Sequence, residues 1–131
     1  MEQGRNICLA APIVIVIDDD AAVRGSIKFA LEAEGIAVRT YSNGLELLEE
    51  ADLATFACFV IDQKLPGMTG LELLAALRER HITAPAILIT SHPTIILQER
   101  AARAGIPIIE KPLLSNALFE RVRAAIARPH P

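Results

Sequence analysis

The 131-residue sequence is poor in cysteine, with only Cys8 and Cys58, which stand far apart. The two cysteines form no CxxC pair and have no partnering histidine cluster. This pattern therefore indicates neither a zinc site nor a disulfide framework. Such cysteine usage favours a cytoplasmic protein.

The sequence also lacks an excess of basic residues, because 13 Lys and Arg stand against 16 Asp and Glu, for a net charge of −3. No charge signal therefore points to direct nucleic-acid binding. No apolar run reaches the roughly 18 residues that a membrane span needs. The first long run ends at Ile17 in three aspartates, without a small-residue cleavage site, so we expect no membrane segment and no signal peptide there.

What is present is the composition of a globular domain, with 52% hydrophobic and 22% charged residues. The length suits one domain with a core of its own. We expect an N-terminal extension over residues 1–11, the domain over 12–128 and a tail over 129–131. No internal repeat or long linker follows, and the sequence predicts no effector domain.

Five short apolar runs have the character of buried strands, each bounded by Gly, Pro, Asp or Asn. They are residues 13–17, 36–41, 56–61, 86–90 and 106–109. Between the runs, apolar residues recur at helical spacing, as in the sets Val23, Ile27 and Leu31; Leu71, Leu74 and Leu77; and Leu118, Val122 and Ile126. The pattern predicts a strand followed by a helix, five times over.

Residues suited to helix ends support this division. The expected C-terminal caps are Gly35 and Gly105, and the expected N-caps are Ser42 or Asn43, Ser115, and Thr69 in a capping box with Glu72. Nearly continuous apolar strands are covered on both faces, as in a parallel sheet with helices on either side. We therefore predict an α/β, doubly wound fold, whose ligands bind at the carboxyl ends of the strands.

Four of the five predicted strands carry polar side chains at their carboxyl ends. They are Asp18, Asp19 and Asp20 after the first strand, Asp62 after the third, Thr90 and Ser91 after the fourth, and Lys111 after the fifth. With the strand order 2-1-3-4-5, Asp18, Asp19 and Asp62 converge at the switch point of the sheet. Three such close carboxylates need a cation among them, because like charges raise one another's pKa.

A hard divalent cation suits this cluster. Mg²⁺ prefers oxygen ligands, and its protein sites commonly combine one or two carboxylates with waters and a phosphate. Lys111 would add a positive charge and Thr90 a hydroxyl donor around the Asp62 carboxylate. The set is typical of phosphoryl transfer, in which positioning and charge neutralisation do most of the work.

These residues, over about 12–127, resemble response-regulator receiver domains, the CheY-like family of flavodoxin-like (βα)₅ fold. The segments TSH and IEKP, around Thr90 and Lys111, are most similar to the FixJ-type branch. The resemblance implies a phosphoacceptor at Asp62 that takes a phosphoryl group from a histidine-kinase phosphohistidine. It also implies Mg²⁺ on Asp18, Asp19 and Asp62 and on the main-chain carbonyl of Lys64, with Asp19 as the direct ligand of the acidic pair.

The resemblance further implies that Thr90 and Lys111 bond the phosphoryl oxygens and that the Lys111–Pro112 bond is cis. It implies a signalling module rather than an enzyme, whose partners are a sensor or hybrid histidine kinase or a phosphotransfer protein, and a downstream protein target. The output and a possible homodimer would use the fourth helix, fifth strand and fifth helix. Charged candidates there are Arg100, Arg103, Glu120, Arg121 and Arg123.

Two departures from the family keep alternatives open. Ile108 stands where most receivers have an aromatic residue, and the stretch from Gly105 to Lys111 is one residue short. A degenerate receiver, acting only as an interaction platform, is therefore the alternative function. A Mg²⁺-dependent phosphatase with Asp62 as nucleophile is disfavoured, because the DxDx[TV] signature is absent after the first strand. Asp20 is interpreted as a helix-start residue rather than a metal ligand.

Overall fold

The computed structural model describes residues 12–50, 56–113 and 116–127. Five parallel strands form its main sheet, in the order β3-β2-β4-β7-β8. Their bounds are β2 Ile13–Ile17, β3 Ala37–Tyr41, β4 Cys58–Asp62, β7 Ala86–Thr90 and β8 Ile108–Glu110. Counted along these five strands the order is 2-1-3-4-5, so the predicted doubly wound fold is confirmed.

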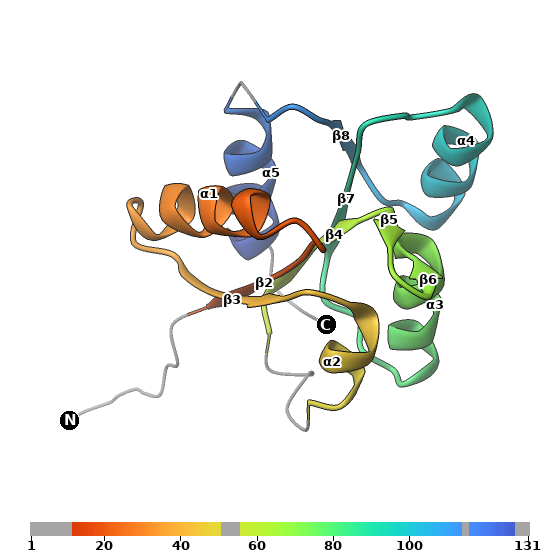
Figure 1. Cartoon of the computed structure of the whole chain (residues 1–131), viewed down its shortest axis with the longest axis horizontal. Helices are drawn as coiled ribbons and strands as arrows, with labels where there is room; N and C mark the ends of the chain where they lie inside the picture. Colours follow the sequence, from red (N-terminus) through yellow and green to blue (C-terminus); the bar gives the residue numbers. More distant parts are fainter. Residues whose placement is uncertain (1–11, 51–55, 114–115, 128–131) are drawn as a thin grey trace.

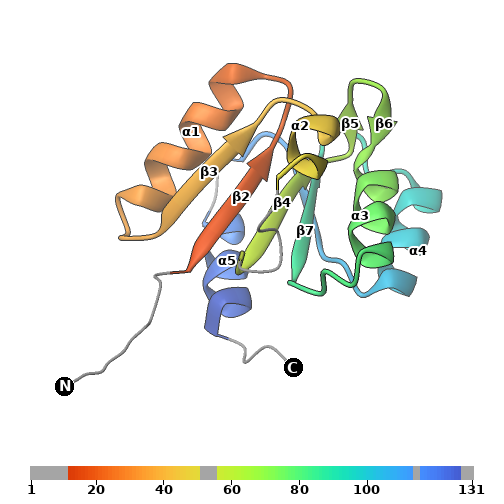
Figure 2. The same cartoon turned by 90° about the horizontal axis from the view of Figure 1, so that it is seen from below.

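Helices cover both faces of the sheet (Figure 1). One face carries α1 (Ala21–Glu32) and α5 (Ala117–Ala127), and the other carries α2 (Gly44–Leu48), α3 (Gly70–Glu79) and α4 (Ile95–Ala104). All five strands run in the same direction, so their carboxyl ends lie along one edge, at the top of Figure 2. This edge is where the polar residues of the sequence were expected to meet.

The strand residues alternate between two hydrophobic clusters, one on each side of the sheet. Ile15 and Ile17 pack toward α2, α3 and α4, whereas Val14 and Val16 pack toward α1 and α5. Burying an aliphatic side chain of this size contributes about 1.5–3 kcal/mol. Cys58 belongs to the second cluster, and burial raises the pKa of its thiol to about 12, so it packs as a small apolar residue.

The bounds predicted for three strands are wrong, and the strand predicted over 36–41 differs least, since β3 begins one residue later at Ala37. The strand predicted over 56–61 begins two residues later and includes Asp62, which pairs with Ile89. The strand predicted over 106–109 is β8, which begins only at Ile108. Ile106 donates its N–H to Ala101 at the end of α4, and proline at the next position has no N–H to give to a sheet.

Most predicted helix ends within the described residues are confirmed, but α1 ends earlier than expected, with Ala33 rather than Gly35 as its C-cap. Asp20 is the N-cap of α1 and accepts from the N–H of Ala22, Asn43 rather than Ser42 caps α2, and Thr69 forms a capping box with Glu72. Gly105 ends α4 with φ 72°, a left-handed conformation that glycine adopts without strain. Ser115, the proposed extension 1–11 and the tail 129–131 lie outside the described residues.

A two-stranded hairpin between β4 and α3 was not predicted. It consists of β5 (Lys64–Leu65) and β6 (Met68–Thr69), which pair antiparallel. Each strand has two residues, too few for an alternating pattern to be detected in the sequence. The hairpin lies beside the carboxyl end of β4 and so borders the expected site (Figure 2).

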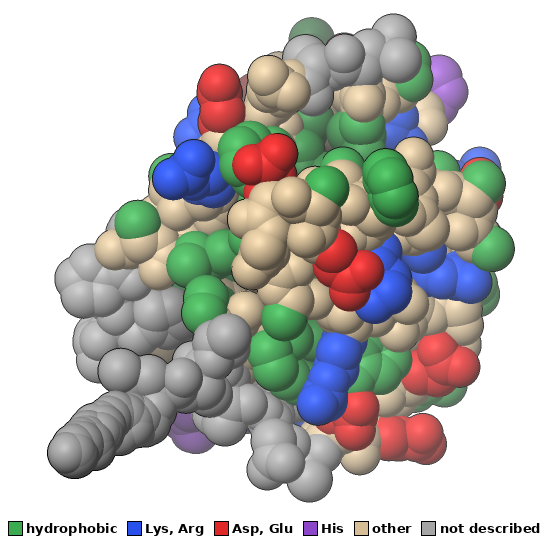
Figure 3. All heavy atoms as spheres, turned by 90° about the vertical axis from the view of Figure 1, so that its left-hand side faces the viewer, with side chains coloured by type: hydrophobic (Ala, Val, Ile, Leu, Met, Phe, Trp, Pro, Cys, Tyr) green, Lys and Arg blue, Asp and Glu red, His purple; other side chains and the backbone are tan. Residues whose placement is uncertain are grey.

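The surface around α1 and β3 carries acidic and basic side chains in a mixed arrangement (Figure 3). Opposite charges next to one another are typical of a solvated face and form no continuous basic patch in this view. Within the described ranges, no helix is both long and apolar enough to cross a membrane.

Candidate functional site

Three carboxylates meet at the carboxyl edge of the sheet, as the sequence predicted. Asp18 follows β2, Asp19 is the next residue, and Asp62 ends the neighbouring strand β4. One oxygen from each lies within 4.8 Å of the others. Asp18 is fully buried and Asp62 is 4% exposed, whereas Asp19 is exposed to solvent. The cluster therefore has two buried carboxylates, Asp18 and Asp62, and one solvent-exposed carboxylate, Asp19.

Lys111 is the cation that faces these buried acids. Its Nζ lies 2.9 Å from Asp18 Oδ2 and 3.2 Å from Asp62 Oδ2. The geometry toward Asp62 is that of a hydrogen bond, whereas Asp18 Oδ2 has only the ion pair and accepts no well-aligned hydrogen bond among the described residues. The main-chain N–H of Lys111 donates to Thr90 O at 2.8 Å, and its bond to Pro112 is cis, as the resemblance implied.

The charges in the site oppose one another. Burial, and then the charge of Asp18, raise the pKa of Asp62, while Lys111 and the N–H of Lys64 act to lower it. Burial disfavours the ammonium form of Lys111, but the close carboxylates of Asp18 and Asp62 outweigh burial and raise its pKa. One lysine thus balances two buried carboxylates only in part, and a further cation would stabilise the ionised pair.

Thr90 and Lys64 also lie where the sequence predicted. Thr90 ends β7, is buried, and accepts a hydrogen bond from the N–H of His92 at 3.2 Å through Oγ1. Lys64 lies in β5, and its main-chain N–H donates to Asp62 Oδ1 at 3.3 Å. The exposed Lys64 side chain makes no ion pair with a described residue. The strands β2, β4, β7 and β8 thus bring Asp18, Asp19, Asp62, Thr90 and Lys111 to one edge of the sheet, and Lys64 lies beside it in β5.

These residues fit a magnesium ion. The donor set is entirely oxygen, which is what Mg²⁺ prefers, and one buried oxygen, Asp18 Oδ2, has no aligned donor. Two of the carboxylates are held in place by bonds to Asp20 N and Lys64 N, so little ordering would be needed on binding.

The loop after β4 depends on Gly70, a residue that the sequence did not mark as part of the site. Gly70 N donates to Gln63 O at 2.9 Å, and Leu71 N donates to Gln63 Oε1 at 3.0 Å. A Cβ on Gly70 would lie 2.7 Å from the carbonyl oxygen of Asp62 and 2.8 Å from Leu88 Cδ1. The start of α3 therefore packs directly against the backbone of Asp62.

We expect Gly70→Ala to lower the free energy of unfolding by about 1–3 kcal/mol, the usual cost of overpacking, because backbone cannot move aside cheaply. The measurement is urea unfolding followed by circular dichroism. Gly25→Ala is the matched control, since nothing lies within 4 Å of a Cβ there and alanine favours a helix by about 0.5–1 kcal/mol. A Gly70→Ala protein as stable as wild type would contradict the close packing.

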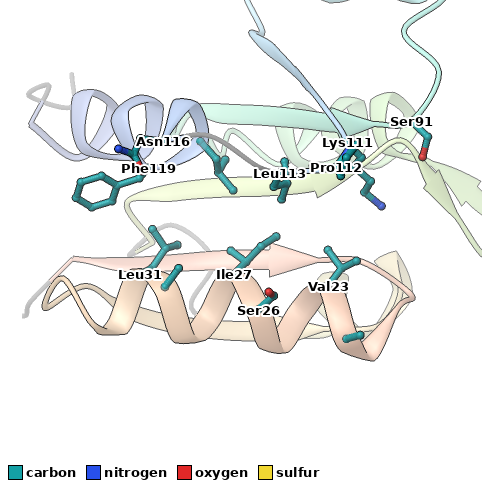
Figure 4. Close-up of a pocket in the computed structure, with 13 residues that line it drawn as sticks. Val23, Ser26, Ile27, Leu31, Ser91, Lys111, Pro112, Leu113, Asn116 and Phe119 are labelled. Carbon is teal, nitrogen blue, oxygen red and sulfur yellow. The ribbon is translucent and has the colours of Figure 1, made fainter.

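A pocket of about 730 Å³ lies next to the site, between α1 and the start of α5. In Figure 4 the side chains of Val23, Ile27 and Leu31 point from α1 toward Leu113. Lys111 and Ser91 lie at the end nearest the carboxylates. The pocket wall is mostly apolar, and Lys111, which pairs with Asp62, is one of the residues that line it.

Comparison with known proteins agrees with this geometry. The sequence model of the response regulator receiver domain matches residues 14–123. The chain is 35% identical over 117 residues to the C4-dicarboxylate transport transcriptional regulatory protein DctR of Rhodobacter capsulatus, covering 87% of the chain and 59% of that protein. It is 37% identical over 116 residues to the transcriptional regulatory protein FixJ of Azorhizobium caulinodans, covering 88% of this chain and 55% of FixJ. The chain therefore belongs to the response regulator receiver domain family.

Solved structures and the FixJ match refine this placement. The response regulator StyR superposes with a TM-score of 0.82 at 32% identity. The match covers 89% of this chain and 60% of the StyR chain. A CheY-like receiver domain from Methanospirillum hungatei superposes with a TM-score of 0.79 at 28% identity. The match covers 89% of this chain and 94% of that receiver domain. The chain is a receiver of the FixJ type, and it spans less than two thirds of the DctR and FixJ sequences. Receiver domains are signalling domains of two-component systems that work with histidine kinases.

Proposed function

We propose that Asp62 accepts a phosphoryl group from the phosphohistidine of a sensor or hybrid histidine kinase, or of a phosphotransfer protein. The observation that carries this proposal is the placing of Asp62 at the end of β4, 3.2 Å from Lys111 Nζ and beside two further carboxylates. A carboxylate at the carboxyl edge of the sheet, where ligands of such folds bind, can act as an oxygen nucleophile. In the same setting the ionised carboxylate is costly unless a cation compensates its charge.

In the transfer, an Asp62 oxygen forms a bond to phosphorus as the bond from phosphorus to the donor imidazole nitrogen breaks. The imidazole takes up a proton, and the chain carries an aspartyl phosphate. Asp18, Asp19, Asp62 and the carbonyl of Lys64 would hold Mg²⁺, which when bound neutralises charge on the phosphoryl oxygens. Lys111 adds a second positive charge beside the same oxygens.

Output would pass from Thr90 to the surface of α4, β8 and α5. The Thr90 hydroxyl accepts from His92 N in this structure, so turning it toward a phosphoryl oxygen would release the loop that leads into α4. The first turn of α4 exposes two large apolar residues, Ile95 and Ile96, at 74% and 69%. Arg100, Arg103, Glu120, Arg121 and Arg123 are exposed on the same two helices. A protein target or a second copy of the chain could cover this surface.

Two relatives described above are named transcriptional regulatory proteins. We therefore propose that the target belongs to gene regulation, with the receiver acting through a protein contact rather than through nucleic acid, and in the cytoplasm. Ile108 is half-buried and pairs with Leu88, so the coupling on this side would use aliphatic packing in place of a rotating ring.

The degenerate receiver, suggested by Ile108, is the alternative; the cluster of Asp18, Asp19 and Asp62 with Lys111 beside it supports the phosphoacceptor instead. The test is incubation of the wild-type chain with acetyl phosphate, in Mg²⁺ or in EDTA, followed by intact mass. We expect a single phosphate adduct in Mg²⁺ and little or none in EDTA. Absence of an adduct under both conditions would favour the platform function.

A further inference from the structure

Arg24 makes a contact with the site that neither the sequence pattern nor the proposed chemistry uses. It lies in the first turns of α1, and its Nη1 donates to the main-chain carbonyl of Asp18 at 2.7 Å. The apolar spacing of α1 marks Val23 and Ile27 as the buried side and gives no sign of this bond. Arg24 therefore links α1 to the loop that carries the acidic pair.

The bond fixes the peptide that joins the two acids. Asp18 itself is held by its N–H to Tyr41 O, by Asp20 N on Oδ1 and by Lys111 at Oδ2. Asp19 is different, because its side chain makes no hydrogen bond or ion pair with any described residue. Its direction therefore depends on the plane of the peptide before it, whose carbonyl points to Arg24.

We propose that Arg24 is a positioning residue for Mg²⁺, holding the Asp18–Asp19 peptide so that the Asp19 carboxylate faces Asp62. This inference rests on the proposed function, since it assigns Arg24 a part in the same metal site. Partners that orient metal ligands from outside the coordination sphere typically contribute 10–100-fold to metal affinity. A hydrogen bond from a charged guanidinium also restrains a carbonyl group more strongly than a hydrogen bond from water does.

A purely electrostatic role of Arg24 and a positioning role predict opposite changes in Mg²⁺ affinity when Arg24 is replaced by alanine. Arg24 is a cation close to an acidic cluster, so losing its charge alone would make the cluster more negative and strengthen Mg²⁺ binding. Losing the restraint on Asp19 would weaken binding. The direction of the change therefore separates a positioning residue from a nearby charge or from a bond that serves only the fold.

The experiment measures Mg²⁺ binding by isothermal titration calorimetry on wild type, Arg24→Ala and Arg24→Lys, with thermal unfolding in EDTA recorded alongside. We expect Arg24→Ala to weaken Mg²⁺ binding roughly 10-fold, at the low end of the range for such partners. Arg24→Lys keeps a donor and a charge and should recover part of the loss. It also keeps the test valid if Arg24→Ala fails to fold.

Lys28→Ala is the matched control, because Lys28 lies one turn along α1 and donates to another main-chain carbonyl, Val38 O, at 3.2 Å. It removes the same charge from the same helix without touching Asp18, so its Mg²⁺ affinity should equal that of wild type. Unchanged or tighter binding by Arg24→Ala, or an equal loss in Lys28→Ala, would overturn the assignment while leaving phosphorylation at Asp62 standing. A wild-type chain that binds no Mg²⁺ would overturn both the assignment and the proposed metal site.

Discussion

Asp62→Asn is expected to take up no phosphoryl group from acetyl phosphate in the presence of Mg²⁺. The amide has nearly the shape of the carboxylate but is not an oxygen nucleophile, so the neighbouring packing is kept while the reacting atom is lost. Asp62 is 4% exposed and is held by Lys64 N and Lys111 Nζ, which leaves little freedom for another group to replace it. The measurement is intact mass before and after incubation.

Asp20→Asn is the control for this substitution. Asp20 is the third aspartate of the same run, but its Oδ1 caps α1 through the N–H of Ala22, and asparagine caps a helix equally well. We expect Asp20→Asn to take up phosphate like wild type. An adduct that persists in Asp62→Asn would show that the acceptor lies elsewhere.

Lys111→Met is expected to have the largest effect on stability. It leaves Asp18, fully buried, and Asp62 facing each other without their cation. Removing one partner of a buried ion pair costs about 3–5 kcal/mol, because the remaining charge is not compensated. In EDTA near neutral pH we expect the free energy of unfolding to fall by about 3 kcal/mol, the low end of that range, since Lys111 is partly exposed.

The loss in Lys111→Met should depend on pH. Burial and Asp18 already raise the pKa of Asp62, and removing Lys111 takes away an opposing effect. The folded variant therefore holds the Asp62 proton more tightly than the unfolded chain does. The stability that this proton contributes is fully present below the ordinary aspartate pKa, about 4, and is lost as the pH rises through the raised pKa.

Urea unfolding at a series of pH values, in EDTA, measures this difference. We expect Lys111→Met to approach wild type at about pH 4 and to fall away toward neutral pH. Lys64→Met is the control for stability, since that side chain is exposed and such substitutions usually change stability by less than about 0.5 kcal/mol. A loss of stability that is the same at every pH would contradict the unbalanced carboxylates as its cause.

The strands that could be predicted best are those whose ends the sequence marks clearly. Residues 13–17 and 86–90 match β2 and β7, because proline precedes both runs and a polar residue closes each, Asp18 after the first and Thr90 at the end of the second. The start of β8 could not be read from apolar character, since Ile106 is equally apolar but closes the end of α4. Hydrogen bonding, rather than hydropathy, decided that boundary.

The site was predictable as a set of residues, because parallel strands bring their carboxyl ends to one edge. Its internal contacts were not. Lys111 lies closer to Asp18 than to Asp62, and a long flexible side chain gives no sequence signal for such a choice. The contacts of Arg24 and Gly70 were also hidden, because each depends on how a helix packs against the backbone of a loop.

The central claim is that phosphate on this chain resides on Asp62. Sodium borohydride reduces an aspartyl phosphate to homoserine, which marks the modified residue permanently. Wild-type chain phosphorylated with acetyl phosphate and Mg²⁺ is reduced, digested and sequenced by mass spectrometry. The account predicts homoserine at position 62; homoserine at Asp18 or Asp19, or phosphate on His92 with position 62 unmodified, would contradict it.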